Sequence, residues 1–275
     1  MTDHPLGESD GIDTSVPNIA RVYDFFLGGS HNFPADRQLA AMIEQNMPHI
    51  ADAARVNRAF LRRAVLYMMD HGIRQFLDIG SGIPTVGNVH EIAQSADPEC
   101  RVVYVDKEPV AVAHGRILLR GNGKAGTIRA DIRDPEEILG RPECKQLLDF
   151  TQPIGLITLL VWHFVPDYDD PAGLLARYRA ALAPGSILAL THFTLDDSSE
   201  GLRQALAEVN NRGREQMFPR THEQVSAMFT GFELADPGLV VSPAWRPQGP
   251  GDFSDSPGSN ALSYAGVAHV PAPPG

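Results

Sequence analysis

Cysteine is scarce in this chain, since Cys100 and Cys144 are the only two among 275 residues. They form neither a CxxC pair nor any spacing typical of a zinc site. Small disulfide-rich folds and structural zinc sites need more cysteines, closely and regularly spaced. We therefore expect two free thiols, no disulfide framework and no metal site.

Long apolar runs and an excess of basic residues are also missing. No apolar run reaches the roughly 18 residues that a membrane span needs, and the beginning, MTDHPLGESDGID, is acidic and polar, unlike a signal peptide. We expect a cytoplasmic protein without a membrane partner. Lys and Arg number 23 against 34 Asp and Glu, a formal charge of −11. Because such a charge opposes binding to a phosphate backbone, we do not expect a nucleic-acid substrate.

The chain has enough apolar content, 43% of its residues, to bury one sizeable core. Residues 1–17 are rich in Asp, Gly, Ser and Pro and are predicted to be a disordered tail. Residues 18–72 are predicted to form an N-terminal helical cap, with a helix over Ala53–Met69 whose Arg55, Arg58 and Arg62 form a solvated face. Residues 73–275 form the predicted core.

In the predicted core, strand-like and helical patterns alternate, which favours an α/β fold with a doubly wound, mainly parallel sheet. Seven strands are expected, at Gln75–Ile79, Arg101–Asp106, Gly126–Ala130, Ile154–Val161, Ser186–Phe193, Phe232–Ser242 and Leu262–Val270. Helices are expected near Val86–Gln94, Pro109–Leu119, Pro142–Phe150, Pro171–Ala183, Glu200–Arg212 and Glu223–Phe229. The stretch Trp245–Asn260, rich in Pro, Gly and Ser, is predicted to be a mobile loop.

The stretch QFLDIGSGIPT carries the clearest functional signal. An apolar strand ends at Asp78, and Gly80 and Gly82 follow where a ligand could approach the backbone. A dinucleotide site would need a third glycine where Thr85 stands. A carboxylate at Asp78 would repel a pyrophosphate but attract the ammonium of an amino-acid-bearing ligand. Ser81 is a poor hydrolase nucleophile, because GSG lacks the G-x-S-x-G pattern.

Two further acids end the next two predicted strands. Asp106 follows an apolar strand beside the glycine turn, where a carboxylate can accept bonds from both ribose hydroxyls of a nucleoside. Asp131 follows the third strand, where it could accept from an adenine amino group while Ile132 packs on the ring. A plain turn role competes for each acid taken alone. The succession of three acids favours a nucleoside site.

This order of motifs, with IGLITLLVWHFVPD on the fourth strand, resembles the class I S-adenosyl-L-methionine-dependent methyltransferases. The segments ARVYDFFLGGSHNFPADR and VNRAFLRRAV resemble a family first catalogued as a domain of unknown function and then assigned as S-adenosyl methyltransferases. The resemblance implies a Rossmann-like sheet with an antiparallel last strand and S-adenosyl-L-methionine as cofactor. It implies cofactor contacts from Asp78, Gly80, Ser81, Gly82, Asp106, Lys107, Asp131, Ile132, Val161, Tyr23 and Asn32.

The segment Ala20–Asp36 has two interpretations. Aromatic and polar groups, Tyr23 and Asn32 among them, crowd around Gly28-Gly29, which favours a cap over the cofactor's methionine end and the substrate. The competing interpretation is a helix that ends at the glycines and restarts near Pro34. No catalytic base is evident. His163, His192 and Tyr23 are candidates, although a histidine at a strand end is more often a structural hydrogen-bonding group.

The sequence thus predicts a methyltransferase that acts on a small or medium-sized acceptor, with the acceptor and the oligomeric state left open. A non-catalytic sensor of the cofactor or its product is the first alternative. A dinucleotide-dependent oxidoreductase is the second, disfavoured by Thr85 and Asp78.

Overall fold

A computed structural model describes residues 13–84, 87–212 and 216–272. Its centre is an eight-stranded sheet in the order β3-β2-β1-β4-β5-β8-β6, with β7 also paired to β8. The five strands that come first in the chain are parallel: β1 (Gln75–Ile79), β2 (Arg101–Asp106), β3 (Ala125–Arg129), β4 (Gly155–Leu159) and β5 (Ile187–Phe193). The long strand β8 (Ser263–His269) runs antiparallel to β5. The predicted Rossmann-like, mainly parallel α/β fold is confirmed.

The sheet has one strand more than the seven expected, because the predicted strand Phe232–Ser242 is divided. It forms two short strands, β6 (Glu233–Leu234) and β7 (Val240–Val241), each antiparallel to β8. Between them lie Pro237, which lacks a backbone N–H to donate to a ladder, and Gly238, whose φ of +88° turns the chain.

Helices separate the strands as the alternation predicts. Those before and within the sheet are α1 (Ile19–Phe26), α2 (Pro34–Asn46), α3 (Ile50–Asp70), α4 (Val89–Ala96), α5 (Pro109–Leu118), α6 (Pro135–Gly140), α7 (Pro142–Leu147) and α8 (Pro171–Ala181). Those that follow β5 are α9 (Glu200–Arg212), α10 (His222–Met228) and α11 (Pro257–Asn260). The short α6 was not predicted; Asp134 caps it and Pro135 begins it. The predicted start of α4 at Val86 lies outside the described residues.

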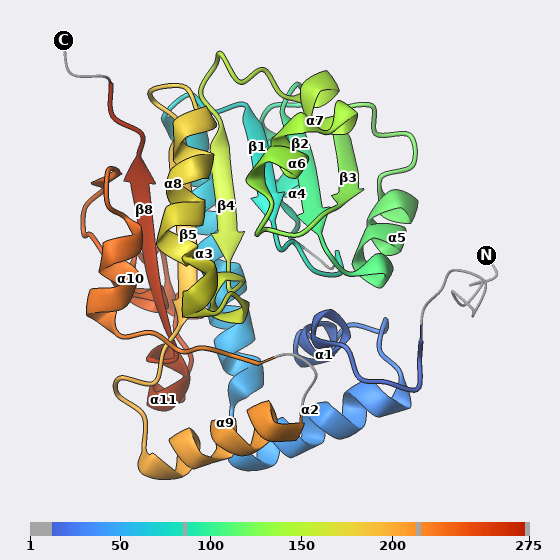
Figure 1. Ribbon diagram of the computed structural model, residues 1–275, viewed down its shortest axis with the longest axis vertical. Coiled ribbons are helices and arrows are strands. Elements are labelled where there is room, and N and C mark those ends of the chain that lie inside the picture. The colour runs from blue at the N-terminus through green and yellow to red at the C-terminus, as the bar shows by residue number, and fades with distance from the viewer. Residues whose placement is uncertain (1–12, 85–86, 213–215, 273–275) are drawn as a thin grey trace.

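Both faces of the sheet are covered, so its central strands β1, β4 and β5 are buried on both sides. On one face the strands pack against α6, α7, α8 and α10, with Ile138, Leu175 and Phe229 in the cluster. On the other they pack against α3 and α4, through Phe60, Met68 and Ala93 among others. Figure 1 shows α8 and α10 in front of the sheet and the long α3 behind it.

The third layer of the molecule lies at the carboxyl edge of the parallel strands. In Figure 1 the arrows of β1, β2 and β4 point toward α1, and α2 and α9 lie beyond it. A separate apolar cluster joins these helices to the end of β5, through Val22, Ile43, Leu206 and Phe193. The N-terminal helices therefore cap the edge at which open α/β sheets bind their ligands.

The segment predicted to be a mobile loop, Trp245–Asn260, is anchored to α3. Trp245 is completely buried, and its carbonyl accepts from Arg63 Nε at 2.9 Å. The same guanidinium pairs with Asp252. The segment also contains α11, so the Pro, Gly and Ser content reflects tight turns in a packed connection. No helix among the described residues is both long and apolar enough to cross a membrane.

Candidate functional site

A cavity of about 510 Å³ opens between the carboxyl edge of the sheet and the N-terminal helices. Its walls come from the ends of β1 to β5 and from α1, α2 and α3. This volume is within the range, roughly 300–1,000 Å³, of sites that enclose small molecules. Ten of the predicted cofactor contacts and the candidate base His163 line it together: Tyr23, Asp78, Gly80, Ser81, Gly82, Asp106, Lys107, Asp131, Ile132, Val161 and His163.

The glycine turn lies against two neighbouring strands. The backbone N–H groups of Gly80 and Ser81 both donate to the carbonyl of Val105, at 2.8 and 3.1 Å. Gly80 has a φ of +75°, and a Cβ there would lie 2.5 Å from Cγ2 of Val161, which also lines the cavity. Glycine is thus required at position 80 both by backbone conformation and by space.

Gly82 also has a positive φ, +65°, but a Cβ there would meet no atom within 4 Å. Its N–H donates to Asp106 Oδ2 at 2.7 Å, and the N–H of Glu108 donates to Oδ1 at 2.9 Å. A carboxylate offers about four lone-pair sites, so Asp106 retains capacity for two further donors. The turn and the acid fit a ligand that presents a pair of hydroxyls.

Burial raises the pKa of both acids at this edge. For Asp78 the pKa rises to about 7, with Arg58 lowering it and Asp106 raising it further. For Asp106 it rises to about 6, opposed by the backbone N–H groups of Glu108 and Gly82. Arg58 therefore acts on the site, whereas the sequence placed it on a solvated face. Only Arg55 and Arg62 of that stripe are exposed.

The third acid differs from the first two. Asp131 is half-buried, and Arg133 Nη2 and Nε bind its two oxygens at 2.7 and 3.0 Å. Its pKa is lowered, because these bonds and charges outweigh the effect of burial. Ile132 is buried beside it, and its carbonyl accepts from Tyr178. Asp131 thus remains ionised at the rim.

Tyr23 joins the N-terminal cap to the sheet. Its hydroxyl accepts from Asn57 Nδ2 at 3.1 Å and donates to the carbonyl of Ala54 at 3.3 Å. Asn57 in turn accepts from Thr191 Oγ1 at 2.8 Å, at the end of β5. Asn57 lines the cavity and was missed by the sequence analysis. A polar residue between Val56 and Phe60 on an apolar helix face was the only available signal.

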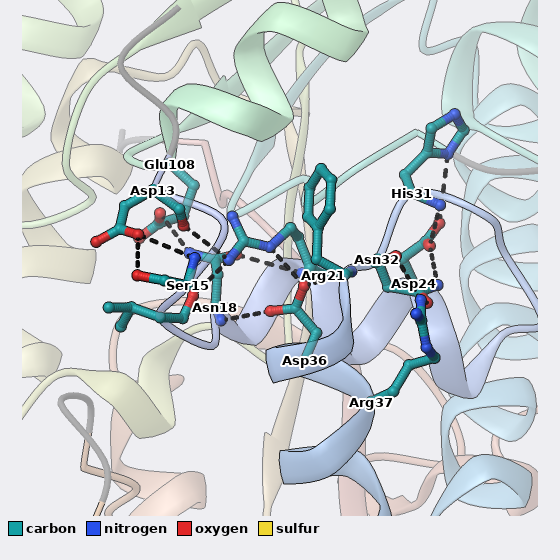
Figure 2. Close-up of polar contacts among 12 residues, drawn as sticks. Asp13, Ser15, Asn18, Arg21, Asp24, His31, Asn32, Asp36, Arg37 and Glu108 are labelled. Carbon is teal, nitrogen blue, oxygen red and sulfur yellow. Dashed lines mark hydrogen bonds and ion pairs between the residues drawn. The ribbon is translucent and has the colours of Figure 1, made fainter. Parts of the chain in front are cut away.

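Asn32 does not line the cavity. Its amide donates to Asp24 Oδ2 and to the carbonyl of Gly29, at 3.0 and 2.9 Å. Figure 2 shows the contact between Asn32 and Asp24, together with the buried ion pair between Arg21 and Asp36, whose Nε and Oδ2 atoms lie 2.7 Å apart. The polar groups around Gly28-Gly29 thus bind one another and fix the turn between α1 and α2, and a cofactor contact from Asn32 stays a prediction.

His192 also lies outside the cavity lining. Its Nδ1 lies 2.8 Å from the carbonyl of Phe193, and its Nε2 lies 2.8 Å from Arg220 Nη1. A neutral ring with its proton on Nδ1 satisfies both contacts. Burial lowers its pKa to about 3. His192 therefore has the geometry of a structural hydrogen-bonding group.

Comparison with known proteins agrees with this arrangement. The model of the S-adenosyl methyltransferase family matches residues 6–271. The chain belongs to this family. Similar solved structures include a DUF574 family protein from Streptomyces avermitilis, 37% identical over 94% of this chain and 99% of that one, with a TM-score of 0.89.

A candidate methyltransferase from Thermobifida fusca is 40% identical over 95% of this chain and 98% of that one, with a TM-score of 0.88. A protein from Bordetella parapertussis shares only the fold, at 20% identity over 98% of this chain and 84% of that one, with a TM-score of 0.58. The comparison with curated proteins finds no match.

Proposed function

We propose that the protein is an S-adenosyl-L-methionine-dependent methyltransferase that acts on a small or medium-sized acceptor. The observation that carries the proposal is one cavity in which a glycine turn and two buried acids adjoin a large apolar wall. In a member of the S-adenosyl methyltransferase family, this arrangement offers space for a nucleoside cofactor and for a second molecule next to it.

Each predicted contact that lines the cavity receives a role in the proposal. Asp106 binds the ribose hydroxyls with its free lone pairs, and Asp78 binds the amino-acid ammonium. Gly80 and Gly82 allow the ligand to approach the backbone, with Ser81 between them and Val161 opposite. Asp131 and Ile132 face the adenine, and Lys107 lies at the ribose side. Tyr23, held by Asn57, borders the methionine end.

The cofactor supplies an electrophilic methyl group when it is bound. The chain's own contribution is alignment and exclusion of water, and alignment alone can lower a barrier by roughly 7–11 kcal/mol. A strong nucleophile needs no base for this reaction, so a site without an evident catalytic dyad is compatible with the activity.

Turnover separates this proposal from a non-catalytic sensor. We expect purified protein to convert S-adenosyl-L-methionine to S-adenosylhomocysteine when supplied with fractions of a small-molecule extract, and Asp106→Asn to slow the conversion at subsaturating cofactor. Binding of S-adenosylhomocysteine without turnover in any fraction would favour the sensor.

A further inference from the structure

The lining of the cavity is divided by charge. Among the described residues, all charged side chains that line it lie on α3 or at the ends of β1, β2 and β3. They are Arg58, Asp78, Asp106, Lys107, Glu108, Asp131 and Arg133. The residues proposed to bind the nucleoside part of the cofactor all lie in this half of the cavity.

The other half is an apolar arm, defined here by Phe26, Ile43, Met47, Phe193, Met217 and Leu262. All six line the cavity and belong to the apolar cluster between the cap and β5. Five of them are less than 9% exposed, so the arm is shielded from water. A charged group placed there would lose its hydration and meet no counter-ion among the described residues.

His163 borders the arm and has an unsatisfied ring. It lines the cavity, is only 5% exposed, and packs against Phe193 with ring centroids 5.9 Å apart. Its Nδ1 is buried without a hydrogen-bond partner among the described residues. Burial, His192 and Arg220 all lower its pKa, so the ring is neutral. Nδ1 has almost no accessible surface, so a ligand in the cavity can hydrogen-bond to the ring only through Nε2.

We infer that the methyl acceptor is an uncharged, mainly apolar molecule of aromatic size with one O–H or N–H group, which hydrogen-bonds to the His163 ring. This inference rests on the proposed function. In the reaction, a bond forms between the acceptor oxygen or nitrogen and the methyl carbon. The carbon–sulfur bond breaks, its electron pair stays on sulfur, and the acceptor proton passes to His163. The positive charge thus moves from the sulfonium to the imidazole.

The step does not need a strong base. The acceptor proton becomes strongly acidic as the new bond to carbon forms, so a weakly basic ring can accept it late in the reaction. After the reaction, the site holds neutral S-adenosylhomocysteine and a neutral, methylated product that no longer has a proton to share with His163.

Naphthalene probes test the inference by calorimetry on protein saturated with S-adenosylhomocysteine. We expect 1-naphthol or 1-naphthylamine to bind at least tenfold more tightly than 1-naphthoate and 1-naphthylmethylammonium. Wild-type protein should prefer 1-naphthol over 1-methoxynaphthalene by about two- to tenfold, the effect of one hydrogen bond. In His163→Leu that preference should disappear while both neutral probes still bind.

Met217→Glu places a charge in the arm and should favour 1-naphthylmethylammonium over 1-naphthol. Phe253→Glu, at an exposed position outside the cavity lining, should leave the wild-type order unchanged. Charged probes that bind wild type as tightly as neutral ones, or neutral probes that do not bind at all, would overturn the inference. Failure of S-adenosylhomocysteine itself to bind would instead remove the proposed function.

Discussion

Asp78 and Asp106 are acids whose ionisation the fold itself controls. Both are 8% exposed, and burial raises the pKa of each. The arrangement destabilises the free protein, because two poorly hydrated carboxyl groups lie side by side. A ligand that brings an ammonium and hydroxyl donors to them relieves that cost, so binding and ionisation are linked.

The linkage predicts the pH dependence of cofactor affinity. The pKa of Asp78 is about 7 in the free protein. A ligand ammonium must bind the ionised carboxylate, and the fraction of protein in which Asp78 is ionised decreases as the pH falls below 7. Calorimetry between pH 5.5 and 8 should therefore show S-adenosylhomocysteine affinity falling as pH decreases below 7, by up to about tenfold per unit. Asp78→Asn should bind more weakly and depend on pH only below about 6, where Asp106 titrates. Equal slopes in both proteins would exclude an ammonium contact at Asp78.

Asp106→Asn tests the ribose contact. The substitution keeps the shape but removes the charge, and charge-assisted bonds contribute about 1.5–3 kcal/mol each. We expect S-adenosylhomocysteine to bind about 10- to 100-fold more weakly, with the protein still folded. Asp255→Asn, at an exposed position, is the matched control. Unchanged affinity in a folded Asp106→Asn protein would remove Asp106 from the site.

At the scale of elements, the cap depends on one buried ion pair. Arg21 on α1 and Asp36 on α2 are 3% and 0% exposed, and Asp36 also accepts from the backbone N–H groups of Asn18 and Phe33. Asn18 in turn reaches Glu108 at the start of α5, at 2.5 Å. The pair thus fixes the α1–α2 turn, and its neighbours attach that turn to the sheet.

Breaking this pair should loosen the cap. Removing one partner of a buried pair leaves an uncompensated charge, which costs about 3–5 kcal/mol. We expect Asp36→Asn to lower the unfolding free energy by about this amount in urea denaturation. The matched control is Asp52→Asn, whose partner Arg55 is exposed and whose loss should cost about 1 kcal/mol or less. Similar losses in the two variants would contradict the assigned role of the Arg21–Asp36 pair.

The sequence predicted those site residues that short local sequence patterns place at the ends of strands. Asp78, the glycines, Asp106 and Asp131 lie at or just after the ends of strands, and parallel strands bring their carboxyl ends to one edge. Local patterns were therefore enough to bring them together. Asn57 and Arg58 could not be assigned in this way, because the face that α3 turns toward the cavity depends on how the helix packs across the sheet. The polar groups around Gly28-Gly29 were also grouped from local sequence; in the structure Asn32 hydrogen-bonds to Asp24 and Gly29, and a ligand contact from this cluster stays a prediction.

At the scale of the whole molecule, Arg220 fastens the carboxyl end of β4 to that of β5. Its guanidinium donates to the carbonyls of Trp162 and Val165, at 3.0 and 2.8 Å, and lies 2.8 Å from His192 Nε2. It also pairs with Asp167 at 2.6 Å. The positive charge is therefore held next to a ring that must stay neutral.

This arrangement predicts a pH-dependent contribution to stability. Burial lowers the pKa of His192 from 6.5 to about 3, so the folded protein binds fewer protons than the unfolded chain between these values. The contribution of neutral His192 to the unfolding free energy is fully present above pH 6.5. It is lost as the pH falls, by about 1.4 kcal/mol per pH unit. The difference in unfolding free energy between wild type and His192→Gln should therefore shrink from pH 6.5 to pH 4.5. Asp78 and Asp106, whose pKa values are raised, act in the opposite direction but are present in both proteins. A constant difference would contradict a neutral, buried His192.

The central claim is that the cavity binds S-adenosyl-L-methionine through the glycine turn. Gly82 and Gly121 both have positive φ, +65° and +83°, and a Cβ at either would meet no atom within 4 Å, but only Gly82 faces the cavity. Valine at either position imposes similar backbone strain, so comparing the two variants isolates the effect on the ligand.

The decisive measurement is calorimetric titration of wild type, Gly82→Val and Gly121→Val with S-adenosylhomocysteine and with NAD. We predict that S-adenosylhomocysteine binds wild type and Gly121→Val but not Gly82→Val, and that NAD binds none of them. Tight binding of NAD to wild type with no binding of S-adenosylhomocysteine would contradict the account.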